Sequence, residues 1–244
     1  MTVQTHDFEA DTGKILNIVI NSLYSDRDIF LRELLSNASD AIHKRRFLGQ
    51  TEPQLLNSSE DEISINVDEK KKTIEIIDTG IGLSADDLTE TFGTIARSGT
   101  SSFLEAIGEN TDNKDAAKTL IGKFGVGFYS AFMVAEKVVA TTRKAGEDDT
   151  LIWESDGKTG YTITSSSDAH ETGTSIKLFL RKDAKEYADS QRLKTLVKKY
   201  SDHILVPIFV TAKDAEKEQA NSAQALWTRS PSEISAEEYS EFYR

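Results

Sequence analysis

Short apolar runs separated by polar turns fill much of the chain after residue 60, and they limit the folds open to it. The stretch EISINVDEKKKTIEIIDTG (62–80) predicts a hairpin, because two strand-like runs flank a charged turn. Turns such as GEDD and DGKTG separate the later runs. These later strands are predicted at 136–144, 150–155, 160–165, 173–180 and 206–211.

Helices are predicted before and between these strands. Residues 28–48 place Leu31, Leu34 and Ala38 on one face at helical spacing. Ser84, with an aspartate three residues later, predicts a capped helix that runs through residue 95. Further helices are expected at 12–23, 126–135 and 190–205. Helices, a hairpin and then a run of strands predict an α+β sandwich.

The composition excludes several classes of protein. The 244 residues are 38% hydrophobic and 29% charged, and no apolar run approaches the ~20 residues that span a membrane. Zero cysteines exclude disulfides and thiolate metal sites. The net charge of −12 (29 basic against 41 acidic residues) argues against nucleic-acid binding. The first residues lack a signal or transit peptide pattern, so we expect a cytoplasmic protein.

The chain is expected to contain one main domain and the start of another. Residues 1–211 are expected to form the main domain. Its Gly-, Ser- and Asn-rich stretch at 97–123 is too long for an ordinary loop and predicts either a lid, at about 93–127, or a disordered insert. Residues 212–225 predict a charged, poorly packing linker. Residues 226–244 are expected to begin a further domain that the chain does not complete.

A polar stripe runs along the helix predicted for 28–48. Glu33, Asn37, Asp40 and Lys44 are spaced so that they stack on one narrow face. Charges on a helix are by default a solvated surface. However, Asn is a mediocre helix former that is usually placed for its hydrogen bonds. A carboxylate one turn from an amide oxygen suits the activation of a water beside a cation, whereas Lys44 is expected to face solvent.

Two glycine motifs supply further candidates. Asp78 ends an apolar strand and is followed by Gly80 and Gly82, so it either accepts a hydrogen bond from a ligand amine or caps its own turn. Ile81 and Leu83 offer apolar walls. The glycines of IGKFGVGFYSAFM (121–133) precede a helix and predict either an anion site or a hinge.

Other familiar sites are not indicated. The chain contains no GxxxxGK[ST] phosphate loop and no GxSxG nucleophile elbow. Its four histidines lack the spacing of metal ligands.

Taken in order, the motifs resemble the heat shock protein 90 chaperones in their bacterial, HtpG-type form. The matching stretches span nearly the whole chain. They are YSDRDIFLRELLSNASDA, DTGIGLS, FGTIARSGTSSF, IGKFGVGFYSAFMVA and GTSIKLFL. Leu83 stands where Met is more common in the family, and Leu35 where Ile is common. Both substitutions keep an apolar side chain.

The resemblance implies a Bergerat-type ATP-binding fold, in which helices and a mobile lid cover a mixed, mostly antiparallel sheet. It implies a general base at Glu33 and a Mg²⁺ ligand at Asn37, with Asp40 supporting the pocket. Asp78 would accept a hydrogen bond from the adenine amine, and Thr174 would support this contact through a water molecule. Gly82 and Leu83 would line the ring. The lid and phosphate loop would contain Ser98, Gly99, Gly122, Phe124, Gly125, Val126, Gly127 and Phe128.

The resemblance also implies a chaperone ATPase that uses ATP or ADP with Mg²⁺, acts on client proteins and cooperates with co-chaperones. The full-length protein would be a homodimer joined through a C-terminal domain, with a catalytic arginine in the next domain. The same fold serves DNA-repair proteins, topoisomerases and histidine kinases. The acidic composition argues against DNA binding. A histidine kinase is not expected, because its acceptor-histidine helices should lie upstream and only about a dozen residues precede the first helix. A nucleotide-gated interaction module without turnover is a further alternative.

Overall fold

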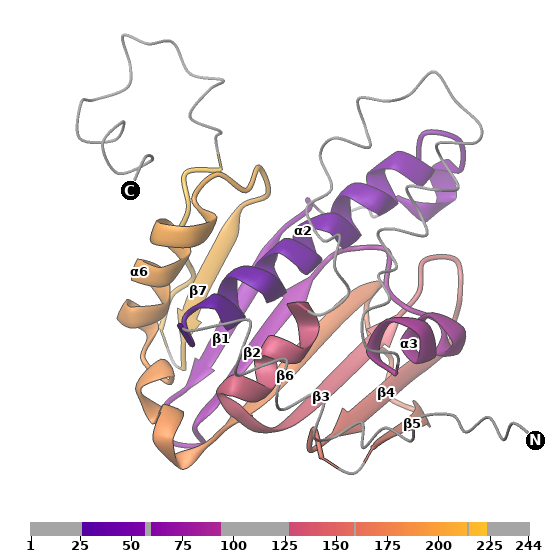
Figure 1. The fold of residues 1–244 in the computed structure, drawn as a ribbon. Helices are drawn as coiled ribbons and strands as arrows, with labels where there is room; N and C mark the ends of the chain where they lie inside the picture. Colours follow the sequence, from indigo (N-terminus) through magenta and orange to yellow (C-terminus); the bar gives the residue numbers. More distant parts are fainter. Residues whose placement is uncertain (1–25, 57–59, 94–126, 159, 214, 224–244) are drawn as a thin grey trace, which may run out of the picture.

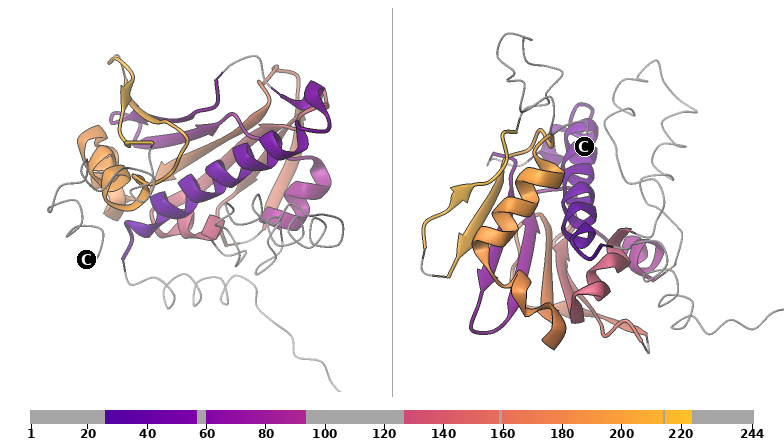
Figure 2. Two further views of the ribbon diagram at one scale, coloured as in Figure 1. Left: turned by 90° about the horizontal axis from the view of Figure 1, so that it is seen from above. Right: turned by 60° about the vertical axis from the view of Figure 1, so that its left-hand side comes forward.

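A computed structural model describes residues 26–56, 60–93, 127–158, 160–213 and 215–223 of the chain (Figure 1). In these ranges one sheet forms the first layer and helices form the second. Two further views show the helices gathered on the same side of the sheet (Figure 2). The predicted α+β sandwich is therefore confirmed. The helix expected at 12–23, most of the expected lid and the expected start of a further domain lie outside the described residues.

The sheet has eight strands in the order β5-β4-β3-β6-β2-β1-β7-β8. Among the described strands, the pairing of β1 with β7 alone is parallel and the other neighbours are antiparallel. The sheet is therefore mixed and mostly antiparallel, as in a Bergerat-type sandwich. The strands are β1 (Ile63–Asp68), β2 (Thr73–Asp78), β3 (Ala135–Arg143), β4 (Thr150–Ser155), β5 (Tyr161–Ser166), β6 (Gly173–Leu180), β7 (Ile208–Ala212) and β8 (Glu218–Gln219).

Three α-helices and three 3₁₀ helices complete the described fold. They are α2 (Ile29–Leu48), α3 (Ala85–Phe92), α6 (Ser190–Ser201), η1 (Pro53–Leu55), η2 (Gly127–Met133) and η3 (Lys182–Tyr187). The predicted cap of α3 is confirmed, because Ser84 and Asp87 form a reciprocal capping box. The helix stops at Phe92, with Gly93 as its C-cap, and does not extend to residue 95. No helix within the described ranges is long and apolar enough to cross a membrane.

The core lies between the sheet and the helices. A row of apolar side chains crosses five neighbouring strands in register, and each side chain is buried: Ile65, Ile76, Ile176, Ala140 and Trp153. Because side chains alternate along a strand, the neighbouring positions face away from the helices. On that outer face Glu75 and Lys177 oppose each other and are partly exposed. One covered face and one open face explain the alternating pattern in the sequence.

Part of the expected linker packs against the domain. Glu218 and Gln219 form β8 on the edge strand β7. The amide of Asn221, which is 6% exposed, donates to the carbonyl oxygens of Ile204 and Val206 and accepts from the backbone N–H of Ile208. The expectation of poor packing is therefore corrected for this stretch, because one amide satisfies three buried backbone groups. The domain boundary itself stays a prediction.

Candidate functional site

A row of polar side chains crosses the helix-covered face of the sheet at one end. Asp78 ends β2 and faces Thr174 of β6, which faces Thr142 of β3. The three residues are 7%, 5% and 0% exposed. Directly opposed residues on neighbouring strands lie on the same face of a sheet. These three buried polar groups therefore lie side by side on a face that is otherwise mostly apolar.

The hydroxyl of Thr142 fixes the hydrogen bonds of its neighbours. It lies 2.9 Å from the carbonyl oxygen of Gly173, which can only accept, so Thr142 must donate there. It accepts from the backbone N–H of Leu83 at 3.0 Å. The hydroxyl of Thr174, 3.0 Å away, must then be a donor to Thr142. The lone pairs of the Thr174 hydroxyl oxygen therefore remain available to another donor, close to the Asp78 carboxylate.

Burial controls the protonation of Asp78. It raises the pKa of this carboxyl to about 7, although the backbone N–H groups of Gly80 and Thr174 and the positive charge of Arg45 act in the opposite direction. The Gly80 N–H donates to Asp78 Oδ1 at 2.8 Å, which is the turn bond foreseen as the alternative role of this residue. One oxygen is thus held by the backbone. The carboxyl group can still accept a further hydrogen bond from a ligand.

The loop after Asp78 packs directly on α2. The backbone N–H of Ile81 donates to the carbonyl oxygen of Ala41 at 3.1 Å. A Cβ added at Gly80 would lie 2.6 Å from the Cβ of Ala41 and 2.6 Å from Asp78 Oδ1. A side chain at position 80 would therefore push the loop off the helix. Glycine at this position keeps the carboxylate and the helix in one fixed arrangement.

Glycine is required at position 82 for a different structural reason. Its φ is +70°, which side chains rarely adopt, and a Cβ there would overlap the carbonyl oxygen of Arg143 at the end of β3. The sequence suggested that this glycine lets a flat ring approach. The structure adds that Gly82 is needed for the close contact between the Asp78 loop and β3.

The Gly82→Ala substitution is expected to lower the free energy of unfolding by about 2 kcal/mol or more, since a left-handed backbone alone costs ~1–2 kcal/mol. Gly146→Ala is the matched control. Gly146 also has a positive φ, of +82°, but its nearest neighbour is the side chain of Leu55 at 3.3 Å. Urea unfolding measures the free energy of unfolding of both variants. Equal losses would show that the contact with Arg143 is unimportant.

The predicted catalytic carboxylate lies beside the second glycine motif. Glu33, in the first half of α2, accepts two hydrogen bonds from Arg32 at Oε1, with distances of 2.7 and 3.2 Å. A Cβ added at Gly127 would lie 2.6 Å from Glu33 Oε2. The end of the motif at 121–133 and the polar stripe of α2 are thus brought together, as the sequence interpretation required. Figure 1 shows η2 beside α2, and the two are in contact.

The spacing along α2 suits an elongated ligand. Asn37 is half-buried and lies one turn from Glu33. Ala41, which anchors the Asp78 loop, lies one turn further on. At 1.5 Å per residue, Glu33 and Ala41 are about 12 Å apart along the helix axis. A ligand with one end at Asp78 and the other at Gly127 would therefore run along the polar stripe.

Asp40 and Lys44, the two remaining residues of the stripe, are both less exposed than residues on a solvated helix face. Asp40 is 5% exposed, in agreement with a supporting role. Lys44 is half-buried rather than exposed, which corrects the expectation that it faces solvent. Burial lowers the pKa of Lys44, while the negative charge of Asp87 opposes that change. Asp87 itself pairs with Lys144 at 2.7 Å.

Phe128 and Leu83 contribute mainly to packing in the described structure. Phe128 is 5% exposed and stacks on Phe92, with ring centroids 3.8 Å apart, and meets Trp153 edge-on. Its side chain thus belongs to the aromatic core, and the place in the phosphate loop that the resemblance implies for Phe128 stays a prediction. Leu83 is half-buried and packs against the core. The residues Ser98, Gly99, Gly122, Phe124, Gly125 and Val126 lie outside the described part of the chain.

Three residues of this region were not foreseen from the sequence. Thr142 is the centre of the hydroxyl network, and nothing in a strand pattern distinguishes it from other threonines. Arg45 and Asp61 form a buried ion pair behind the Asp78 loop. Arg45 did leave a signal, because it continues the apolar spacing of Ala38 and Ile42 on α2 although it is charged.

A mixed sheet covered on one face by helices, with a buried carboxylate at a strand end and a second carboxylate on the covering helix, is the arrangement expected of a Bergerat-type ATPase. The comparison with protein families agrees. Residues 24–171 match the family described as histidine kinase-, DNA gyrase B-, and HSP90-like ATPase. Since this match covers more than half of the chain, the chain belongs to that ATPase family.

Within the family, the chain is of the HtpG type. It is 51% identical over 246 residues to the chaperone protein HtpG of Rickettsia massiliae (strain Mtu5). It is 47% identical over 245 residues to the chaperone protein HtpG of Methylorubrum populi (strain ATCC BAA-705 / NCIMB 13946 / BJ001). Each alignment covers 100% of this chain and 39% of the relative. The chain therefore spans about two-fifths of the length of these relatives and corresponds to their ATPase domain.

Proposed function

We propose that the domain binds the adenine ring of ATP or ADP at Asp78 and Thr174. The observation that carries this proposal is the pair of neighbouring buried acceptors, the Asp78 carboxylate and the Thr174 hydroxyl. The exocyclic amine of adenine offers two hydrogens, which suits two acceptors or one acceptor and a bridging water. Guanine presents a carbonyl oxygen at the corresponding edge and would leave these groups unsatisfied.

The phosphates would run along α2 toward Gly127 and the preceding glycines. Among the described residues, no group of three or more His, Asp or Glu side chains could hold a metal ion. This fits Mg²⁺, which commonly takes one or two protein ligands and completes its shell with phosphate oxygens and water. Asn37 offers the amide oxygen for that role. Bound there, Mg²⁺ would neutralise charge on the phosphates.

Glu33 would act as the general base. Arg32 holds its Oε1, and Oε2 lies beside Gly127, which is the end of the proposed phosphate site. A water oxygen attacks the γ-phosphorus while the bond to the β,γ-bridging oxygen breaks. ADP leaves with that oxygen, and Glu33 takes the proton of the water. Phosphoryl transfer depends chiefly on position and charge, so a fixed carboxylate contributes by orienting the water.

The activity of the full-length protein belongs to the same proposal. ATP turnover in a homodimer, joined through a C-terminal domain, would drive the remodelling of client proteins in the cytoplasm, with co-chaperones as further partners. The relatives are named as chaperones, and this supports the chaperone role over DNA-acting or histidine-kinase members of the family. The net charge of −12 also argues against nucleic-acid binding.

The isolated domain is expected to bind ADP and ATP but to hydrolyse ATP much more slowly than a protein of the full length of its relatives. The reason is that phosphoryl transfer needs charge stabilisation that we assign to the following domain. A steady-state phosphate-release assay on both proteins checks this expectation. Turnover by the domain as fast as that of the longer protein would contradict it. The absence of turnover in both would favour a nucleotide-gated interaction module.

A further inference from the structure

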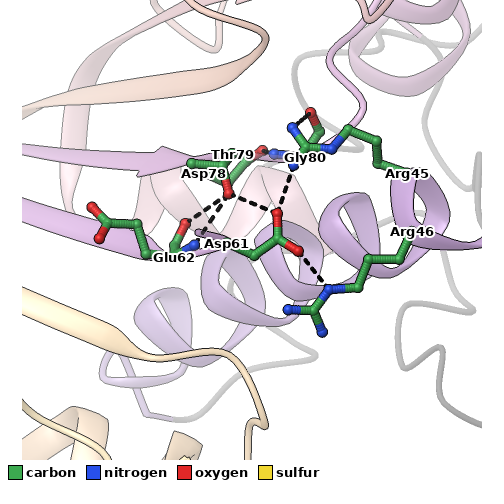
Figure 3. A network of polar contacts seen from close by, with 7 residues as sticks. All are labelled: Arg45, Arg46, Asp61, Glu62, Asp78, Thr79 and Gly80. Carbon is green, nitrogen blue, oxygen red and sulfur yellow. Dashed lines mark hydrogen bonds and ion pairs between the residues drawn. The ribbon is translucent and has the colours of Figure 1, made fainter. Parts of the chain in front are cut away.

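Arg45 is a buried cation directly behind the Asp78 loop. It lies in the second half of α2 and is 1% exposed. Its Nη2 donates to Asp61 Oδ1 at 2.6 Å, and its Nη1 lies 3.4 Å from the carbonyl oxygen of Gly80. Figure 3 shows the side chain reaching from the helix toward both partners. The guanidinium thus connects the covering helix with the backbone of the loop.

Asp61 anchors this arrangement from the other side. Besides Arg45, its carboxylate accepts from the Nε of Arg46 and lies 3.4 Å from the hydroxyl of Thr79. The same Thr79 hydroxyl accepts from the backbone N–H of Glu62 at 3.1 Å. The loop that carries Asp78 is therefore held between the start of β1 and α2 by a continuous polar network (Figure 3).

A structural ion pair alone does not account for a charge at this position. Arg45 continues the apolar face of α2, and replacing buried ion pairs by apolar side chains is often neutral or stabilising. Thr79 and Ile81 already tie the loop to β1 and α2 through their own hydrogen bonds. What an apolar side chain cannot supply is a positive charge and a donor aimed at the Gly80 carbonyl.

We propose that Arg45 is a positioning residue for nucleotide binding. It holds the Asp78–Gly80 loop in its binding geometry and supplies the positive charge that the buried Asp78 carboxylate needs in order to accept a hydrogen bond from a ligand amine. This inference rests on the proposed adenine-binding role of Asp78. It assigns Arg45 no contact with the nucleotide itself.

The proposal predicts a pH dependence with a definite sign. Asp78 has a pKa of about 7 and accepts best when ionised, so ADP affinity should rise as the pH increases through 7. The charge of Arg45 lowers this pKa, and its loss should move the rise to higher pH. The other charged groups near the loop are Asp40 and Lys44 of α2, and Asp87, which pairs with Lys144. Asp61 pairs with both Arg45 and Arg46, and His43 lies within electrostatic range of Asp61. The neighbours Gly80 and Thr174 have no titratable side chain.

The test is ADP binding by calorimetry between pH 6 and 9 for five forms of the domain. Arg45→Met and Arg45→Gln remove the charge, and Arg45→Lys keeps it. Arg46→Met is the matched control, because Arg46 also pairs with Asp61 but is exposed, and within the described ranges it makes no hydrogen bond to residues 78–80. Titration of the ADP phosphate is common to all forms and cancels in the comparison. Circular dichroism checks that each form is folded.

For the neutral variants we expect the midpoint of the pH profile to rise by about one unit, which weakens ADP binding about fivefold at pH 7 and much less at pH 9. Arg45→Lys should keep the wild-type midpoint, and Arg46→Met should match the wild type throughout. Unshifted midpoints in the neutral variants, or the same shift in the lysine variant, would overturn the proposal. So would the failure of both neutral variants to fold. A wild-type domain that binds no ADP would instead refute the proposed function.

Discussion

Replacing Asp78 by Asn is expected to abolish adenine nucleotide binding and, at the same time, to stabilise the empty domain. The amide would present its two hydrogens or its single oxygen where the ligand amine needs an anionic acceptor, and a buried mismatch costs ~1–3 kcal/mol or more. Its oxygen can still accept from the Gly80 N–H, so the turn should persist. Isothermal titration with ADP measures the loss, and an affinity equal to that of the wild type would refute the adenine role.

The stabilisation follows from the direction of the pKa shift. Burial raises the pKa of Asp78 from 3.8 to about 7, so the folded domain holds this proton more tightly than the unfolded chain does. The stability that this group contributes is fully present below pH 4 and is lost as the pH rises through 7. Asn carries no charge and avoids this loss, so the gain at pH 8 should be on the order of 1–4 kcal/mol.

Urea unfolding at pH 5.5 and pH 8 checks this gain, which should be larger at pH 8. Asp86→Asn serves as the control, because Asp86 lies exposed in α3 and its removal should leave the stability nearly unchanged at both pH values. Destabilisation of Asp78→Asn at pH 8 would mean that the carboxylate contributes to the fold rather than being retained at a cost for binding.

The second large effect is expected at Glu33. In a protein of the full length of the HtpG relatives, Glu33→Ala should leave ADP affinity within about twofold of the wild type but reduce the hydrolysis rate by ~10²–10⁴-fold. The side chain contacts Arg32, which is partly exposed, and therefore contributes little to stability. Single-turnover measurements separate the chemical step from product release.

Glu90→Ala is the matched control for that measurement, since Glu90 is an exposed helical glutamate with no assigned role in the proposed site. It should hydrolyse ATP at the wild-type rate. Undiminished hydrolysis in Glu33→Ala would assign the general base to another residue, whereas loss of ADP binding would make Glu33 part of the binding site.

The features predicted well from the sequence depend on short-range patterns. The helix predicted at 28–48 is α2, the hairpin at 62–80 is β1 and β2, and the Ser84 capping box is present as expected. In each case the signal lies within a few residues, through helical spacing, a turn or a cap. Recognition of the family depended likewise on continuous motifs, and the family comparison agrees with it.

The features that could not be predicted depend on contacts between distant segments. The parallel pairing of β1 with β7 joins segments more than a hundred residues apart. The hydrogen bonds of Thr142 depend on the register of β3 with β6 and on the position of the loop after β2. Lys44 was expected in solvent because helical spacing gives the face of a residue but not what covers that face. Asn221 was expected in a poorly packing stretch because its neighbours are charged. The sequence does not show that its amide accepts a hydrogen bond from the backbone of Ile208.

We infer that the paired acceptors Asp78 and Thr174 make this domain a site for adenine nucleotides. Calorimetric titration of residues 1–244 with ATP and with GTP, each with and without Mg²⁺, tests it most directly. We expect ATP to bind at one site, more tightly with Mg²⁺, and GTP to bind at least tenfold more weakly, because its O6 would face two acceptors. Equal affinities for the two nucleotides, or no binding of ATP, would contradict the claim.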